Sequence, residues 1–275
     1  MRSSTRARWS DAVSQGAEIP ALVASPPTVE TSLGMKLLPS VLSLTAGSVD
    51  VIGFLGLNGL FTAHVTGNLA ILAAHVVTGD PAILSYLVSV PVFMAVLLLT
   101  RLLAGSLEAI GFAPLRPLLL LQALLLAGFL GLCLTAGPRV DPDTPTAIAA
   151  GMLGVAAMAV QNALVQVALT GVPSTAVMTT NVTRFMTDVG TLLIGRDPGD
   201  VVKARRRTKD TWPVIVGFTV GCALGACGQA LIGLRSLALP VGLAVLAFAM
   251  GRASPQPVRA GAMRAFSRQG QLLNR

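Results

Sequence analysis

The chain has 275 residues, of which 53% are hydrophobic and only 12% are charged, whereas soluble domains carry about 25% charged residues. Because this shortage of charge extends over most of the sequence, it excludes a soluble domain with one membrane anchor and predicts an all-α, polytopic membrane protein. The net charge of +8 lies in tails and loops with few aromatic residues for stacking, which indicates the positive-inside rule and argues against nucleic acid as a partner.

Eight apolar elements follow one another along the chain, which gives room for six to eight membrane helices of roughly 20 residues each. Turn-forming pairs such as Asn58-Gly59 and Gly137-Pro138 separate them, and the alternation typical of an outer-membrane barrel is missing. Lipid forces backbone groups to pair within each element, so all eight are expected to be helices. The predicted ranges are 37–57, 62–78, 81–103, 115–136, 144–170, 176–194, 212–233 and 236–251.

The sequence divides into three parts. Residues 1–34 lack the apolar run of a signal peptide and are expected to form a disordered cytoplasmic tail, while residues 252–275 form a basic cytoplasmic tail. The transmembrane domain, 35–251, lies between them. Its halves, about 37–136 and 144–251, carry polar residues in a similar order, which we interpret as a divergent internal repeat.

The second and sixth elements decide the topology, because each is short or polar. If both cross the membrane, the protein has eight spans and parallel halves. If both are broken or re-entrant, it has six spans and inverted halves. Gly67 and the run Thr179-Thr180-Asn181 can interrupt a helix, which favours six spans. Both topologies place the N-terminus, the loop 195–211 and the C-terminus in the cytoplasm.

The second element carries two histidines. His64, Asn68 and His75 fall on one helical face, but their spacing is not that of a metal-binding pair and no carboxylate or cysteine accompanies them, so no metal is expected. A proton relay is the more credible function, since histidine titrates near neutral pH. A hydrogen-bonded histidine between helices is the structural alternative.

The sixth element carries a polar stripe. Asn181, Arg184, Asp188 and Thr191 recur every three or four residues, and Asn181 corresponds to Asn68 in the first half. A charge near the bilayer centre costs about 2.5–3.5 kcal/mol. Arg184 and Asp188 are four residues apart, so we expect them to pair and to face the protein interior or a wet cavity. Such a pair either serves a substrate pathway or fixes the helix register.

Further polar residues lie in the first and fifth elements. Asp50 lies in the middle of the first element, where an isolated carboxylate is expected to take up a proton or to find a cationic partner, with Arg184 as one candidate. The amides Gln161 and Asn162 occupy the corresponding place in the second half. Amides at such positions either serve function or hold helices together.

Motifs of enzymes and of cofactor binding are missing from the sequence. Cys133, Cys222 and Cys227 have no CxxC spacing, which argues against a zinc site or a disulfide framework. There is no Walker loop, Rossmann fingerprint, GxSxG elbow or HExxH motif. The sequence therefore predicts neither an enzyme nor a bound cofactor.

The paired motifs resemble those of a known family. Gly47-Ser48-Val49-Asp50 is followed by Thr66-Gly67-Asn68, and the second half reads Ala157-Met158-Ala159-Val160-Gln161-Asn162-Ala163 and then Thr179-Thr180-Asn181. Together they resemble the YoaK family, a bacterial integral membrane family of unknown function, over about residues 37–250. Ala159 and Thr180 stand where that family usually has glycine. The resemblance implies a bacterial inner (plasma) membrane location and no particular activity.

The leading hypothesis is a small-molecule transporter or permease whose polar site lies at mid-membrane between the two halves. The alternatives are a non-transporting scaffold or regulatory protein and, less favoured, a membrane enzyme that uses Asp50 with His64 or His75. The expected partners are the lipid bilayer and an unknown small molecule or ion, and a homo-oligomer stays open. The predicted pathway residues are Asp50, His64, Thr66, Gly67, Asn68, His75, Gln161, Asn162, Thr179, Thr180, Asn181, Arg184 and Asp188.

Overall fold

The computed structural model describes residues 33–79, 83–135 and 144–253 of the chain. Within these ranges the chain forms α-helices joined by short loops, with one 3-10 turn and no strand, which confirms the all-α prediction. The two predicted tails, 1–34 and 252–275, lie almost entirely outside the described residues.

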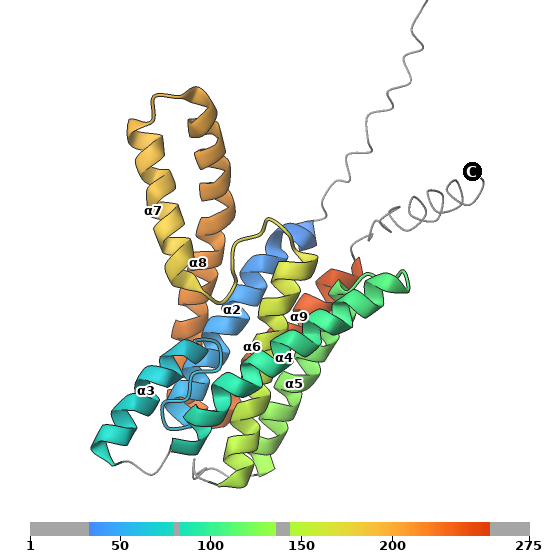
Figure 1. Ribbon diagram of the computed structural model, residues 1–275, viewed down its shortest axis with the longest axis vertical. Coiled ribbons are helices and arrows are strands. Elements are labelled where there is room, and N and C mark those ends of the chain that lie inside the picture. The colour runs from blue at the N-terminus through green and yellow to red at the C-terminus, as the bar shows by residue number, and fades with distance from the viewer. Residues whose placement is uncertain (1–32, 80–82, 136–143, 254–275) are drawn as a thin grey trace, which may run out of the picture. The chain divides into compact units, whose positions relative to one another are not determined.

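The helices follow one another in the predicted order (Figure 1). Most predicted elements agree with the observed helices to within two turns. The observed bounds are α2 Leu33–Gly56, α3 Val65–Thr78, α4 Ile83–Ala109, α5 Leu115–Thr135, α6 Pro145–Ala168, α7 Met178–Ile194, α8 Pro198–Ile232, the 3-10 turn η1 Gly233–Leu237, and α9 Ala238–Ala253.

The prediction was wrong for the seventh element, which begins at Pro198 and not at residue 212. Asp197 caps this helix by accepting a hydrogen bond from the Gly199 N–H at 2.9 Å, and proline is favoured at the first helical position. Most of the predicted loop 195–211 is therefore the first part of α8. Its charges indicated exposure to water, which a polar helix satisfies as well as a loop does.

Five segments of the described residues are long and apolar enough to cross a membrane, which is the pattern of a multi-pass membrane protein. They are α2, most of α4, α5, α6 and the stretch Pro198–Arg252, which contains α8 and nearly all of α9. The apolar helix α3 has only 14 residues, and the polar helix α7 has 17. The two elements on which the topology depends are thus the two that do not qualify as spans.

The helices α2 and α6 are the most buried of the five segments, and they run antiparallel to each other. Gln161 of α6 reaches the carbonyl of Leu42 in the first half of α2. Gly151, earlier in α6, lies beside Leu57 and Leu60, which follow the end of α2. Residue numbers therefore rise along α2 in the direction in which they fall along α6.

The other helices pack around α2 and α6. The helix α2 contacts α8 and α9, whereas α6 contacts α4 and α5, and α5 also contacts α9. The short helix α3 packs on α4. The other short helix, α7, lies along the first half of α8, as Figure 1 shows. Each short helix is thus supported by the long helix that follows it in the chain.

Glycines allow α8 to approach α2 closely. Gly217, Gly221 and Gly225 recur every four residues on α8, and a Cβ on any of them would lie 2.3–2.8 Å from a backbone oxygen of α2. Only a residue without a side chain permits this approach. In lipid, where no hydrophobic effect draws helices together, such close packing is a main source of helix association.

We expect Gly221→Ala to lower the stability of the full chain by about 2 kcal/mol, because an added methyl group has no space there. Its Cβ would lie 2.3 Å from the carbonyl oxygen of Leu44. Thermal unfolding of the purified protein in detergent measures the change. Gly242→Ala in α9 is the matched control, since a Cβ there meets no atom within 4 Å. Equal unfolding temperatures for the two variants would contradict close packing of α8 on α2.

Candidate functional site

The first candidate site surrounds Asp50, near the end of α2. The carboxylate is buried, and its Oδ1 accepts hydrogen bonds from the N–H groups of Thr62 and Ala63, both at 2.7 Å. Longer contacts join the same oxygen to the Thr62 hydroxyl at 3.3 Å and to the His64 N–H at 3.4 Å. Asp50 therefore satisfies the backbone of the loop before α3, as a capping side chain satisfies the first N–H groups of a helix.

His64 lies between this carboxylate and the protein surface. Its Nδ1 is 2.6 Å from Asp50 Oδ2, and its ring meets the rings of Phe61 and Phe218 edge to face. The imidazole is 39% exposed and the carboxylate only 4%, so the pair joins a buried acid to an accessible base. The prediction that Arg184 could be the partner of Asp50 was wrong, because the ion-pair partner of Asp50 is His64.

Asn68 holds the other side of the same loop. Its Oδ1 accepts from the Phe61 N–H at 2.9 Å, while its Nδ2 donates to the Phe61 carbonyl at 2.8 Å and to the Ser89 hydroxyl of α4 at 3.0 Å. The amide thus satisfies both backbone groups of one loop residue. Gly67, which was predicted to interrupt the helix, lies inside α3, and its missing side chain leaves space for the Phe61 ring.

The second candidate site surrounds Gln161 in α6. Its Nε2 donates to the Leu42 carbonyl of α2 and to the Thr175 hydroxyl, each at 2.9 Å, and its Oε1 accepts from Gln122 Nε2 of α5 at 2.7 Å. The three polar side chains are all buried. Gln161 therefore contacts the loop before α7 as Asp50 contacts the loop before α3, but it carries no charge.

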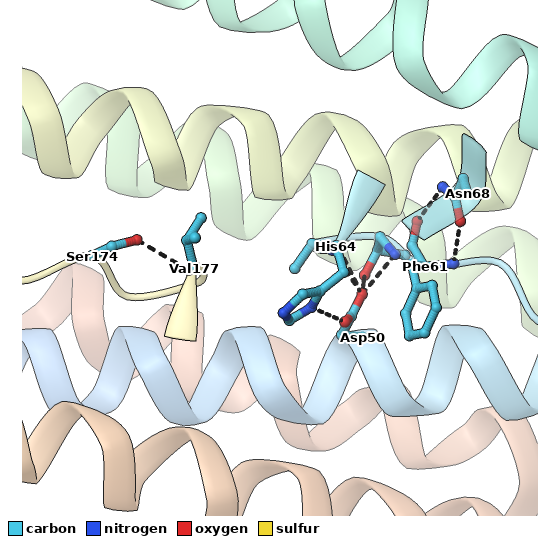
Figure 2. A network of polar contacts seen from close by, with 8 residues as sticks. Asp50, Phe61, His64, Asn68, Ser174 and Val177 are labelled. Carbon is cyan, nitrogen blue, oxygen red and sulfur yellow. Dashed lines mark hydrogen bonds and ion pairs between the residues drawn. The ribbon is translucent and has the colours of Figure 1, made fainter. Parts of the chain in front are cut away.

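Asn181 bonds the second loop at the spacing that Asn68 uses in the first. Its Nδ2 donates to the Ser174 carbonyl at 2.6 Å, seven residues earlier, and Phe61 lies seven residues before Asn68. The Ser174 hydroxyl also accepts from the Val177 N–H at 3.0 Å. In Figure 2, the hydrogen bond between Ser174 and Val177 lies on the left of the view, apart from the hydrogen bonds of Asp50.

The loops 57–64 and 169–177 come toward α2 from opposite ends. The first follows α2 and folds back to Asp50. The second follows α6, and Gln161 links it to Leu42 of α2. Leu42 and Asp50 are eight residues apart in one helix, which is about 12 Å along its axis. The polar contacts of the two halves thus meet the same helix a little over two turns apart.

The charged residues of α7 are arranged differently from the prediction. Asp188 is buried and accepts hydrogen bonds from Arg207 of α8, at 3.0 and 3.1 Å from Nε and at 2.5 Å from Nη2. Arg184 is exposed, so the predicted Arg184–Asp188 pair is wrong. The early start of α8 explains the difference, because it brings a guanidinium beside Asp188 in a two-pronged geometry that carboxylates favour.

Besides Arg184, three of the predicted pathway residues lie on the surface. Thr66, Thr179 and Thr180 are exposed in the first turns of α3 and α7. Asn162 is half-buried and donates to the Met158 carbonyl of its own helix at 2.8 Å. It also lines a pocket of about 160 Å³ at the end of α6, together with uncharged polar side chains that include Gln166, Thr170 and Ser174.

His75 does not join the Asp50–His64 pair. It lies in the last turn of α3, where its ring centroid is 5.0 Å from that of Tyr86. Eleven residues separate the two histidines, which corresponds to about 16 Å along a helix. A cluster of Asp50, His64 and His75 around one pocket, which the enzyme hypothesis needs, is therefore not what the structure shows.

Some residues of these sites were missed by the sequence analysis. Gln122 interrupts a run of leucines in α5, and that interruption was a usable signal. Thr62 and Thr175 each lie six residues before the paired asparagines, a match that comparison of the halves could have found. Nothing in the sequence indicated Arg207 as the partner of Asp188, since Arg207 belongs to the stretch 195–211, which was predicted to be a loop.

The side chains at these sites offer groups that bind protons and polar solutes. Among the described residues, no group of three or more His, Cys, Asp or Glu side chains is placed to hold a metal ion. The Asp50–His64 pair can exchange a proton, because imidazole titrates near neutral pH. The Gln122–Gln161–Thr175 network offers only neutral donors and acceptors.

Comparison with known proteins gives one family. The family model described as "Protein of unknown function (DUF1275)" matches residues 38–250. This match supports the resemblance drawn above from the paired motifs. Neither the comparison with curated proteins nor that with solved structures gave a match.

We expect Asn68→Ala to lower the stability of the full chain by about 3 kcal/mol, because it leaves a loop N–H and a loop carbonyl without their partner. Thermal unfolding in detergent measures the loss. Thr66→Ala, an exposed change in the same helix, is the control and should move the unfolding temperature little. A small shift for Asn68→Ala would mean that water or other groups already satisfy Phe61.

A second prediction follows from the pairing of Asp188 with Arg207. Arg207→Gln should lower the unfolding temperature, because it leaves a buried carboxylate without its guanidinium, whereas Arg184→Gln should not. A double-mutant cycle with Asp188→Asn measures the coupling of each arginine to the carboxylate. Coupling of Asp188 to Arg184 and not to Arg207 would restore the pairing predicted from the sequence.

Proposed function

Because the chain belongs to the DUF1275 family of proteins of unknown function, we propose a function from its geometry: a small-molecule transporter or permease built from two related halves of opposite orientation. The helices α2 to α5 form one half and α6 to α9 form the other. The polar site lies between the halves, where the loops 57–64 and 169–177 approach α2.

The observation that carries this proposal is a symmetry in the helix contacts. Replacing α2, α3, α4 and α5 by α6, α7, α8 and α9 turns the α2–α8 contact into α6–α4, α2–α9 into α6–α5, and α3–α4 into α7–α8. Each of these contacts is present, and the α2–α6 and α5–α9 contacts map onto themselves. Since α2 and α6 are antiparallel, this symmetry supports inverted halves.

The hydrogen bonds of the two loops support the same relation. Asn68 and Asn181 each bond a carbonyl seven residues earlier, and Asp50 and Gln161 each bond a residue of the loop that follows their own helix. Transporters with inverted repeats place their sites near the bilayer midplane, at helices that are interrupted. Non-helical backbone is tolerated at that depth where protein buries it or a cavity borders it.

Six crossings follow from this arrangement: α2, α4, α5, α6, the second part of α8, and α9. Basic side chains gather at one end, on Lys36 at the start of α2, Arg116 at the start of α5, Arg252 at the end of α9 and the stretch 196–209. Under the positive-inside rule this end, where α2 begins and α9 ends, is cytoplasmic. The bacterial inner membrane is the location that the proposal assigns.

The alternative is a scaffold or regulatory membrane protein in which the same polar contacts only hold the loops in place. The Asp50 and Asn68 side chains are fully engaged in such contacts, which a static protein also requires. The two functions differ in one measurable property, because only a transporter moves a solute across a sealed membrane.

Reconstituted liposomes test the proposal. The full chain should move at least one labelled solute, from a panel of amino acids, sugars, organic acids and nucleosides, faster than liposomes without protein. For that solute, Asp50→Asn should lower the flux about tenfold, because it weakens charge-assisted hydrogen bonds to the loop by about 1–2 kcal/mol. Asp200→Asn makes the same chemical change at an exposed carboxylate and is the control.

Each result of this test has a separate meaning. Flux that is equal in the wild type and in Asp50→Asn would reject the site at the first loop. An absence of flux for the whole panel would favour the scaffold. Equal losses in Asp50→Asn and Asp200→Asn would show an effect of surface charge and not of the loop.

A further inference from the structure

The two loops differ in one chemical respect. The loop 57–64 is held by a carboxylate that pairs with an imidazole, whereas the loop 169–177 is held by the uncharged groups of Gln161, Thr175 and Asn181. Only the first set can gain a proton near neutral pH. We propose that the Asp50–His64 pair is a proton-binding site and that the proton is the coupling ion; the coupling role rests on the transporter function proposed above.

The exposure of the pair gives the proton a route. In the unloaded state Asp50 is ionised and accepts the proton of His64 Nδ1 across the 2.6 Å contact. A proton that binds at Nε2 of the part-exposed ring makes an imidazolium ion. The Nδ1 proton stays on the ring, because imidazole is the stronger base of the two, and the contact with Asp50 Oδ2 becomes an ion pair. One proton is gained and no other bond changes.

Proton loading strengthens the hold on the loop. An imidazolium ion pairs with the Asp50 carboxylate through opposite charges as well as through the hydrogen bond, so the contact of His64 with Asp50 is stronger than that of a neutral imidazole. Asp50 keeps its bonds to the N–H groups of Thr62 and Ala63 in both states. When the proton leaves, the backbone before α3 is free to open more often, while Asn68 still retains Phe61.

Among the described residues, two titratable side chains face Asp50. One is His64 of the loop, and the other is Cys222 of α8, whose thiol interacts with the charge of Asp50. A cysteine thiol titrates near pH 8.5 and histidine near pH 6.5. A response between about pH 5.5 and 7.5 therefore belongs to the Asp50–His64 pair.

Amide hydrogen exchange of the full chain in detergent, followed by mass spectrometry, tests the proposal without any solute. After correction for the intrinsic effect of pH, segment 57–68 should exchange about tenfold faster at about pH 7.5 than at about pH 5.5, as expected for the loss of the ion pair between His64 and Asp50 when the proton leaves. Segment 169–181 has the same architecture without a titratable group, so its corrected exchange should stay constant. It is an internal control within the same protein.

Two variants separate the proton site from a general loss of structure. Asp50→Asn should exchange fast in segment 57–68 at every pH, with no change in segment 169–181. His64→Gln can still donate a hydrogen bond to Asp50, so the loop should stay protected near neutral pH. Its exchange in segment 57–68 should not depend on pH between about 5.5 and 7.5, because glutamine takes up no proton.

Some outcomes would overturn the inference. A wild-type pH response that persists in Asp50→Asn, or an equal response in both segments, would show that the loop does not report on this pair. Failure of the transporter proposal would appear separately, as a pH-dependent loop in a protein that moves no solute. A solute flux that ignores an imposed pH gradient, beside a pH-dependent loop, would reject coupling and leave the proton site.

Discussion

The arrangement of this protein depends on how two stretches of non-helical backbone are satisfied inside a membrane bundle. Hydrocarbon cannot hydrate N–H and C=O groups, so the loops 57–64 and 169–177 need partners from the protein itself. Side chains supply them: Asp50 and Asn68 in the first loop, and Gln161 and Asn181 beside the second. Polar residues that appear misplaced in apolar helices are therefore a requirement of the fold.

This requirement also orders the helices. Each loop folds back along the helix that precedes it, and the short helix that follows rests on the next long helix, α3 on α4 and α7 on α8. The helices α2 and α6 must stay near the centre, because they carry the residues that bond the loops. The glycines of α8 complete the arrangement by allowing its backbone to touch α2.

Comparison of the two halves of the sequence found the polar side chains of both sites but not their partners. Asp50, Asn68, Gln161 and Asn181 were visible because polar residues in apolar helices are costly and therefore informative. Their main partners are backbone atoms, such as the N–H groups of Thr62 and Ala63, which leave no trace in residue type. The break was for this reason assigned to Gly67, although it lies before α3.

The error at Asp188 has a related physical cause. Helical periodicity identifies residues on one face of one helix, and by that rule Arg184 was the natural partner. The contact with Arg207 joins two helices, and it depends on where α8 begins. Composition could not fix that point, because a charged helix outside the bilayer and a charged loop look alike in sequence. The all-α class, by contrast, followed from composition alone, since lipid leaves the backbone few choices.

Similar geometry with different chemistry gives the two loops different sensitivities. If both were held by carboxylates, a change in pH would act on both sides of the bundle together. With Asp50 beside the first loop and Gln161 beside the second, the proposed proton site acts on the first loop alone and leaves the second to neutral hydrogen bonding. In the proposed transporter, alternating access requires that the two sides respond differently, and a carboxylate in one half matched by an amide in the other provides that difference.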